Sequence, residues 1–354
     1  MTATAALMSA PSMFQLPSDF EKYRDFFLWE HEDTDKVVES AFAFRAKPEK
    51  EDITDTAVQN YLGGLYAHIK KKFPGTDDFA VAYQGVTFRG HRISTLTGPL
   101  LALRRVPTKA PVLEDLALPP LWRDILMFPD LAYGGLIFLA AVMGQGKSTT
   151  TAAIITSRLQ RYAGYCLTIE DPCELPLHGM HGQGICIQTA VKPEHGRQGF
   201  AEGLRGALRS YPTLPSGSMC LVGEVRDGET AAEALRAGVN GTLVITTVHA
   251  KSVHSAIARF LAMAETVMGP KTARDLLASS FRVGIHQTLT LDPEEEGWRR
   301  GKIGGEMLFS KDETSQVAAA IRAEGAESLV EPIRYQSTLH AQNLRFSEFI
   351  KRVM

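Results

Sequence analysis

The sequence predicts an α/β protein, with a mostly parallel, helix-covered sheet in its larger domain, a smaller α/β domain before it and helices after it. Two observations lead to this class. Beyond residue 111, short apolar runs alternate with segments of helical period, as in repeated strand–helix units. The chain has 354 residues, 44% of them hydrophobic and 22% charged, which is enough for two or three domains with their own cores.

The first 110 residues are expected to form a disordered start and a small α/β domain. Residues 1–20 mix small, polar and apolar side chains, and we expect disorder there; residues 21–110 are the expected domain. The pattern predicts a helix over 55–72, which Pro74 and Gly75 bring to an end. It also predicts strands over these segments: 37–46, 79–83, 87–96 and 100–106. The stretch 107–111, with a proline at each end, indicates a linker.

Residues 111–310 are expected to form the larger domain. Strands are predicted near these segments: 135–141, 165–170, 219–223 and 242–248. Helices are predicted near these segments: 147–160, 200–210, 228–238, 252–264 and 271–288. Strands that alternate with helices in this way favour a parallel sheet with helices on its faces.

Residues 311–354 are expected to form a helical extension, after a strand near 304–309. The side chains of Phe346, Phe349, Ile350 and Val353 recur at helical spacing and make one apolar face. A helix packed on its own domain is the favoured interpretation. A helix that binds a partner is the alternative.

The segment from Leu136 to Thr150 is the most informative about chemistry. An apolar run of strand character ends in a glycine turn, and Lys147 then opens a helix. Backbone N–H groups and the helix N-terminus converge on one point in this arrangement, and a lysine adds a mobile positive charge, so it binds phosphate groups. The candidate nucleotide-binding residues are Gly144, Gln145, Gly146, Lys147, Ser148 and Thr149. The Ser148 hydroxyl is placed to ligate Mg²⁺.

This P-loop departs from the strict pattern at one position, because Ala141 stands where the first glycine is usual. If the backbone there needs a positive φ, alanine costs on the order of 1–2 kcal/mol; if φ is negative, it costs little. A chance glycine turn before a helix is the alternative to a P-loop, but the strand–turn–helix context favours the P-loop.

Three later strands also end in polar side chains. Glu170 ends the second predicted strand, Glu224 follows the third, and His249 follows the fourth. Carboxylates at the carboxyl edge of a parallel sheet face the ligand crevice, where they hold a metal or polarise a water. We therefore take Glu224, Glu170 and His249 as candidate catalytic residues. The Mg²⁺ candidates are Ser148, Glu170 and Glu224, partly through water. The alternatives are an acidic loop or helix cap for Glu170, a solvated acid for Glu224 and a structural role for His249.

Composition excludes some classes of function. The net charge of −2 makes no electrostatic case for nucleic acid. The four cysteines form no C-x-x-C pair, so a zinc site is not expected. The longest apolar run, 135–143, is well short of the ~20 residues that cross a bilayer. The first basic residue is Lys22, so no secretory signal is expected. A soluble or membrane-peripheral protein follows from these features.

Four ordered motifs lie in Thr168–Glu174, Phe200–Arg209, Leu221–Thr230 and Thr247–Ser252, and together they resemble those of the secretion ATPases of type II and type IV secretion and of type IV pili. The acidic box matches Thr168–Glu174, and an arginine-bearing helix matches Phe200–Arg209. The Gly-Glu-x-Arg-Asp signature matches Leu221–Thr230, and the histidine box ends in Thr247–Ser252. Gln188 and the run 287–289 also fit. The resemblance spans roughly residues 80–310 and is closest to the pilus-retraction and type IV secretion or conjugation branches.

The resemblance implies a RecA-like P-loop core with a smaller, PAS-like N-terminal domain. It implies an ATPase that uses ATP and Mg²⁺, works as a homo-hexameric ring, and lies in the cytoplasm at the periphery of the inner membrane. The expected partners are inner-membrane platform or secretion-channel proteins, with no direct nucleic-acid contact. Arginines of the small domain would complete the nucleotide site, and the positions that match are Arg89, Arg104 and Arg105.

Several positions depart from the family pattern. Thr213 stands where the family has the aspartate of a Pro-Asp pair, an insertion follows over 214–217, and Thr242 replaces the first histidine of the histidine box. The four-cysteine zinc motif of the assembly ATPases is absent, which favours retraction or type IV secretion. These departures, with Ala141, motivate the alternative of a catalytically weak regulatory or scaffold subunit in the same ring. A RecA-like nucleic-acid motor is a third hypothesis, which the mild acidity disfavours.

Overall fold

The computed structural model describes residues 16–18, 20–44, 49–171, 173–191, 199–212, 218–290, 301–342 and 344–353. These residues fall into two compact units, divided between Thr108 and Lys109. The disorder expected over 1–15, Pro172 of the acidic box, and the insertion with Thr213 lie outside the described residues. Phe20, which falls within the expected disordered start, is fully buried instead and begins the 3₁₀ helix η1 (Phe20–Lys22).

The first unit is built on a six-stranded antiparallel sheet of order β3-β2-β1-β6-β5-β4. Its strands are β1 (Asp25–Trp29), β2 (Phe42–Phe44), β3 (Lys50–Asp52), β4 (Asp78–Tyr83), β5 (Val86–Thr95) and β6 (Gly98–Val106). Alternate residues of these strands enter one aromatic-rich core. Each chain reversal in an antiparallel sheet sends the next strand end to the opposite edge.

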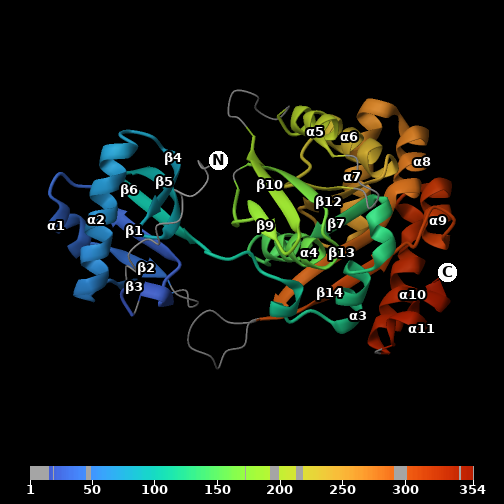
Figure 1. Cartoon of the computed structure of the whole chain (residues 1–354), viewed down its shortest axis with the longest axis horizontal. Coiled ribbons are helices and arrows are strands. Elements are labelled where there is room, and N and C mark those ends of the chain that lie inside the picture. The colour runs from blue at the N-terminus through green and yellow to red at the C-terminus, as the bar shows by residue number, and fades with distance from the viewer. Residues whose placement is uncertain are drawn as a thin grey trace, which may run out of the picture. The chain divides into compact units, whose positions relative to one another are not determined.

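Two helices complete the first unit and lie side by side, α1 (Thr34–Glu39) and α2 (Thr56–Lys72) (Figure 1). The Asp55 side chain accepts from the Val58 N–H and starts α2 as predicted. The strand predicted over 37–46 is wrong in its first half. Asp33 caps α1 by accepting from the Asp35 N–H, so the chain is helical through Glu39.

The second unit holds an eight-stranded sheet of order β14-β13-β7-β12-β11-β8-β10-β9. The six inner strands run parallel, and β14 and β9 are antiparallel edges. The strands are β7 (Gly135–Ala140), β8 (Tyr165–Glu170), β9 (Gly179–His181), β10 (Gly184–Ala190), β11 (Ser218–Val222), β12 (Thr242–Val248), β13 (Phe281–Thr290) and β14 (Lys302–Phe309). The predicted parallel α/β class is confirmed.

Helices cover both faces of this sheet. One face packs on α5 (Gly199–Ser210), α6 (Gly228–Val239), α7 (Val253–Met268), α8 (Pro270–Ser280) and α9 (Gln316–Glu324). The other face packs on α3 (Pro120–Leu126), α4 (Lys147–Tyr162), α11 (Phe346–Val353) and the 3₁₀ turns η2 (Leu113–Asp115) and η3 (Pro129–Tyr133). Helix α10 (Val330–Ala341), which follows η5 (Glu327–Leu329), contributes to both cores. Phe138 enters one core, and Ile137 and Leu139 enter the other, so both faces of the sheet are covered. A ligand can therefore reach the sheet only at its edges.

The helix predicted over 271–288 is wrong beyond residue 280. Helix α8 ends at Ser280, and the chain continues directly into β13. Phe281, Val283 and Ile285 are buried at every second position, so the period changes from helical to strand at Phe281. Pairing on both sides, with β7 and β14, stabilises the strand.

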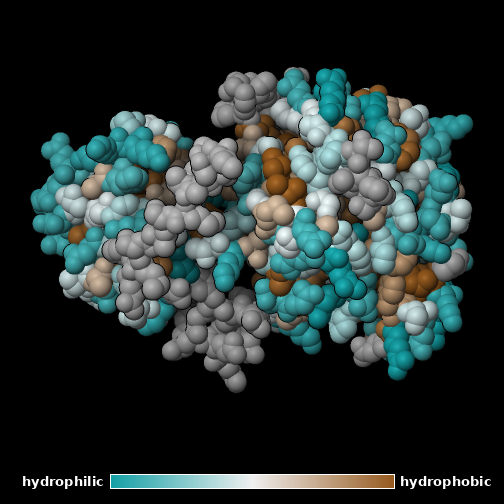
Figure 2. Space-filling view, viewed as in Figure 1, coloured by the Kyte–Doolittle hydropathy of each residue, from teal (hydrophilic) through white to brown (hydrophobic). Residues whose placement is uncertain are grey.

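The C-terminal helix α11 packs on its own unit, as favoured from the sequence. Phe349 and Val353 are buried in the core beside α3 and α4, and Phe346 and Ile350 are half-buried against it. Within the described part of the chain, every helix is too short or too polar to span a membrane. On the face shown in Figure 2, hydrophobic residues lie in separate small areas of a mainly hydrophilic surface.

Candidate functional site

Four neighbouring strands bring the candidate residues to one edge of the second unit's sheet. The strands β7, β12, β11 and β8 are adjacent and parallel, so their carboxyl ends lie together. In that order they lead into the P-loop, His249, Glu224 and Glu170. The carboxyl edge of a parallel sheet is where open α/β folds bind ligands.

The P-loop has the geometry of a phosphate cradle. Gly144 and Gly146 both have φ of 79°, a left-handed conformation that only glycine adopts at little cost. Gly146 is the N-cap of α4, and no described side chain caps the helix there. The first N–H groups of α4 are therefore available to an anion, and the helix dipole favours one. Ser148 and Thr149 lie half-buried in this first turn, so the loop fits a phosphate group.

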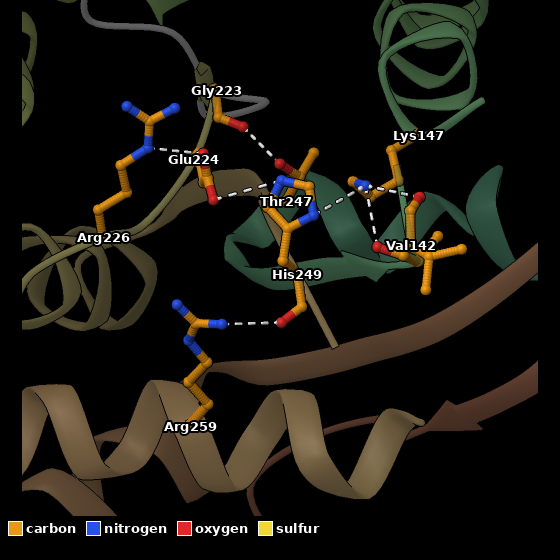
Figure 3. Close-up of polar contacts among 9 residues, drawn as sticks. Val142, Lys147, Gly223, Glu224, Arg226, Thr247, His249 and Arg259 are labelled. Atoms are coloured by element: carbon orange, nitrogen blue, oxygen red, sulfur yellow. Dashed lines mark hydrogen bonds and ion pairs between the residues drawn. The ribbon is translucent and has the colours of Figure 1, made fainter. Parts of the chain in front are cut away.

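Lys147 lies over the loop that precedes it. Its Nζ donates to the carbonyl oxygens of Ala141 at 2.9 Å and Val142 at 3.2 Å (Figure 3). Burial lowers the pKa of Lys147, and the nearby carboxylates of Glu224 and Glu174 oppose that shift. The ammonium group is thus held at the cradle by two carbonyl oxygens, and the nearby carboxylates favour its charged form.

His249 lies between the lysine and the carboxylate of Glu224. Its Nδ1 is 3.5 Å from Lys147 Nζ, and its Nε2 is 3.5 Å from Glu224 Oε1 (Figure 3). The Arg259 guanidinium donates to the His249 carbonyl at 3.0 Å and fixes the backbone from α7. Three of the candidate side chains therefore form one continuous line of polar contacts.

Glu224 is held from two sides. Arg226 Nε lies 2.6 Å from its Oε2, and the His249 ring faces its Oε1. The hydroxyl of Thr247 donates to the Gly223 carbonyl at 2.6 Å, which fixes the end of β11 to β12. Sequence reasoning gave Arg226 and Arg259 no role at the site. Arg226 stands within the quoted Leu221–Thr230 signature, but only the folded chain shows that it contacts Glu224.

Glu170 lies in the same region at the end of β8 and is only 8% exposed. Gln188 Nε2 donates to its Oε1 at 2.9 Å, and the Gly223 N–H donates to the Ile169 carbonyl at 2.9 Å. Burial raises the pKa of Glu170 above its usual value, against the hydrogen bonds that favour the carboxylate. Glu170 and Glu224 are thus carboxylates of adjacent strand ends, within the same polar edge.

The donors at this edge suit Mg²⁺ in kind, because hydroxyl and carboxylate oxygens are its preferred ligands. Ser148 follows Lys147 at the cradle, and Glu224 and Glu170 supply carboxylates. Across the described residues, three or more carboxylate, histidine or cysteine side chains nowhere converge closely enough to hold a metal. A magnesium ion at the edge would therefore depend on phosphate oxygens and water as well as on these side chains.

Ala141 does not strain the loop. Among the described residues, the non-glycine positions with positive φ are Gln84 and Ala163, so Ala141 has an ordinary backbone conformation. Ala141 is fully buried, and its carbonyl accepts from Lys147. Alanine at this position therefore costs little, as the sequence analysis expects for a residue without a positive φ.

The three candidate arginines belong to the first unit. Arg89 on β5 lies opposite Arg104 on β6, and Arg105 lies opposite Phe88. Arg104 Nε is 2.6 Å from Asp25, and the Arg105 guanidinium lies 5.8 Å from the centre of the Phe20 ring. These contacts are all internal to that unit, and the arginines' role at a nucleotide stays a prediction.

Comparison with known proteins gives the family. A family model described as type II/IV secretion system protein matches residues 68–344. The chain is 33% identical to the uncharacterized protein YggR of Escherichia coli K12, over 62% of this chain and 64% of YggR. It is 32% identical to the type IV pilus retraction ATPase PilT of Pseudomonas aeruginosa, over 70% of each chain. The chain thus spans somewhat less than two thirds of the first of these relatives.

Solved structures agree on the fold. The pilus retraction motor PilT with bound ADP superimposes with a TM-score of 0.68 and 22% identity, over 94% of each chain. The ATPase DotB of Legionella pneumophila gives 0.61 and 20%, over 94% of this chain and 93% of DotB. Together with the P-loop edge, the family match shows that the chain belongs to the type II/IV secretion system protein family.

Proposed function

We propose that the chain is an ATP-hydrolysing motor subunit, which works as a homo-hexameric ring in a type IV pilus or type IV secretion machine. The observation that supports this most is the line of contacts Lys147–His249–Glu224, which joins the phosphate cradle to a held carboxylate. A positive charge that binds phosphate and a carboxylate that orients the attacking water are two recurring parts of sites that transfer a phosphoryl group to water.

Each side chain has a separate task in this proposal. The N–H groups of Gly144, Gln145 and Gly146 and the first turn of α4 bind the phosphates, and Lys147 moves from its loop carbonyls to the phosphate oxygens. Glu224 orients the attacking water and accepts its proton. His249 contacts both groups and so couples the position of the carboxylate to the occupancy of the cradle.

Mg²⁺, when bound through Ser148 and, by way of water, Glu224 and Glu170, would neutralise charge on the phosphates. The buried Glu170 carboxyl lies against Gln188 and is held in place for such a contact. Arg89, Arg104 and Arg105 would supply further positive charge to the phosphates from the small domain.

The proposed setting is the one that the family resemblance implies. The ring would lie in the cytoplasm at the inner membrane, on platform or secretion-channel proteins, with no direct nucleic-acid contact. A scaffold subunit without turnover has less support, because Ala141 lies in an unstrained conformation and the Lys147, His249 and Glu224 side chains contact one another.

Hydrolysis by the purified chain tests the proposal, with Glu224→Gln beside it. We expect ATP-dependent phosphate release from wild type, a fall of about 10²–10⁴-fold in the variant, and retained ATP binding. Glu331→Gln is the control, since Glu331 is an exposed acid on α10 that lies 3.9 Å from Arg334 and outside the quoted motifs. Unchanged hydrolysis by Glu224→Gln would remove Glu224 from its role, and particles that do not contain six subunits in a closed ring would contradict the hexamer.

A further inference from the structure

The strand β13 continues past the end of its neighbour β7, still paired with β14, and runs beside the P-loop. Its pairing with β7 ends at His286 and Ala140, whereas β13 itself extends to Thr290. The last residues of β13 therefore lie where the chain from β7 has already turned into the loop. One of them, Gln287, is a buried polar side chain that no step of the proposed hydrolysis uses.

Gln287 is 1% exposed, and both the nitrogen and the oxygen of its side-chain amide are hydrogen-bonded to the nucleotide-binding element. Its Nε2 donates to the Gln145 carbonyl at 2.5 Å, and its Oε1 accepts from the Thr150 hydroxyl at 2.8 Å. Gln145 lies in the loop, and Thr150 lies one turn into α4. The amide thus connects the loop to the helix that it leads into.

A second contact reinforces the first. The Gln145 side chain turns back to β13, where its Oε1 accepts from the Leu289 N–H at 2.6 Å. Gly146 leaves little room between loop and strand, because a Cβ there would lie 3.2 Å from Gln287 Nε2. Residue 145 is therefore held through both its backbone and its side chain.

We infer that Gln287 is a positioning residue that holds the P-loop in its phosphate-binding shape, so that nucleotide affinity depends on β13. A loop whose N–H groups must converge on one anion loses affinity when its backbone is free to move, since ordering it then costs free energy on binding. This inference rests on the proposed nucleotide binding. It assigns no contact between Gln287 and the nucleotide.

Gln287→Glu is the sharpest test, because it keeps size and shape. One carboxylate oxygen still accepts from Thr150, but the other faces the Gln145 carbonyl, so a donor is replaced by an acceptor. We expect the dissociation constant of a fluorescent ATP analogue to rise about tenfold or more. In hydrolysis, KM for ATP should rise by the same factor, and kcat should change less than about threefold.

Gln336→Glu is the matched control. Gln336 is also a buried glutamine, 2% exposed, whose side-chain amide makes two hydrogen bonds. Its Oε1 accepts from the Phe309 N–H and its Nε2 donates to the Phe309 carbonyl, both at 2.8 Å. Those bonds join β14 to α10 and do not involve the P-loop. A purely structural cost of a buried glutamate should therefore appear in both variants as lower thermal stability, whereas weaker nucleotide binding should appear in Gln287→Glu alone.

The outcomes separate the two hypotheses. If wild type binds the analogue and both glutamate variants bind it equally well, or are weakened equally, the inference is wrong and the proposed function stands. If wild type binds no nucleotide, the proposed function itself fails. Should Gln287→Glu not fold, Thr150→Val removes only the bond that anchors the Gln287 oxygen. A several-fold loss of affinity is expected there, and wild-type affinity would overturn the inference.

Discussion

The two sheets of this chain use their polar residues in different ways. In the antiparallel sheet of the first unit, Arg92 pairs with Glu30 at 3.0 Å and Arg104 with Asp25 at 2.6 Å, so charges are satisfied between neighbouring strands or the loops beside them. In the parallel sheet of the second unit, Lys147, His249 and Glu224 follow three separate strands and meet at one edge. Strand direction decides this difference, because only parallel strands deliver all their carboxyl ends to the same place.

Parallel strands therefore gather chemical groups from distant parts of the chain. Residues that follow parallel strands all lie at one edge of the sheet and meet there, whereas antiparallel strands end alternately at its two edges, so their charged residues pair across the strands instead. Substitutions in both units test this contrast, and the greatest losses are expected where a charge would act directly on the phosphates.

The arginines of the first unit give the strongest test of the contrast. If Arg89, Arg104 and Arg105 act on the nucleotide, alanine at the responsible position should lower kcat by about 10³–10⁵-fold, as the loss of an arginine finger does elsewhere. Phosphate release by each single variant measures this. Asp25→Asn is the matched control, since it removes the partner of Arg104 but keeps the arginine. If all three variants lose only stability, the first unit is structural and the contrast between the sheets is complete.

Lys147→Ala should have the next largest effect. The lysine would make charge-assisted bonds to phosphate, worth about 1.5–3 kcal/mol, so its loss weakens ATP binding roughly ten- to hundredfold or more. Isothermal titration with ATP measures this. Lys50→Ala provides the comparison from the first unit, because Lys50 is an exposed lysine paired with Asp52 at 2.6 Å. Equal affinity in the two variants would mean that the P-loop lysine does not bind phosphate.

Glu170 and Glu30 should respond in opposite directions to the same substitution. Burial raises the pKa of Glu170 above its usual value of 4.5, so the folded protein disfavours the charged form. This cost is absent below about pH 4.5 and is complete once the pH has risen through the raised pKa. Glu170→Gln should therefore raise the melting temperature at pH 7, by a margin that shrinks towards pH 4. Glu30→Gln should lower it, because it leaves the half-buried Arg92 without its carboxylate. Thermal melts at several pH values distinguish the two, and a lower melting temperature for Glu170→Gln at pH 7 would contradict the first.

Ala141→Gly, which restores the usual P-loop glycine, should have the smallest effect. Since Ala141 has no positive φ, glycine relieves no strain and adds freedom to the unfolded chain. We expect the free energy of unfolding to fall by about 0.5–1 kcal/mol in urea denaturation. A tenfold gain in turnover would show instead that alanine limits the loop.

Much of the second unit could be predicted from the sequence, because its strands are buried on both faces and appear as apolar runs. The run Thr242–Val248 is a strand over the predicted residues, and the P-loop helix begins at Lys147 as expected. The segment from Phe281 could not be assigned in this way, since a short apolar stretch fits a helix or a strand until its neighbours β7 and β14 are known.

The same limit applies to the site. The sequence places Glu170, Glu224 and His249 after strands, but the order β7-β12-β11-β8 that makes them neighbours depends on packing. Gln287 and Arg226 stand inside recognisable motifs, yet nothing in their spacing indicates which atoms they contact. A glutamine that binds a carbonyl 142 residues away is visible only in the folded chain.

The lysine that rests on two carbonyl oxygens of its own loop has a consequence for how ligands compete. A phosphate that binds Lys147 must replace the carbonyl oxygens of Ala141 and Val142 as hydrogen-bond acceptors. Binding is therefore an exchange of acceptors, in which the ammonium keeps hydrogen-bond partners throughout. Such an arrangement discriminates by charge density. The highly charged oxygens of a triphosphate bind the ammonium more strongly than the carbonyl oxygens do, whereas those of a weakly charged anion of similar size do not.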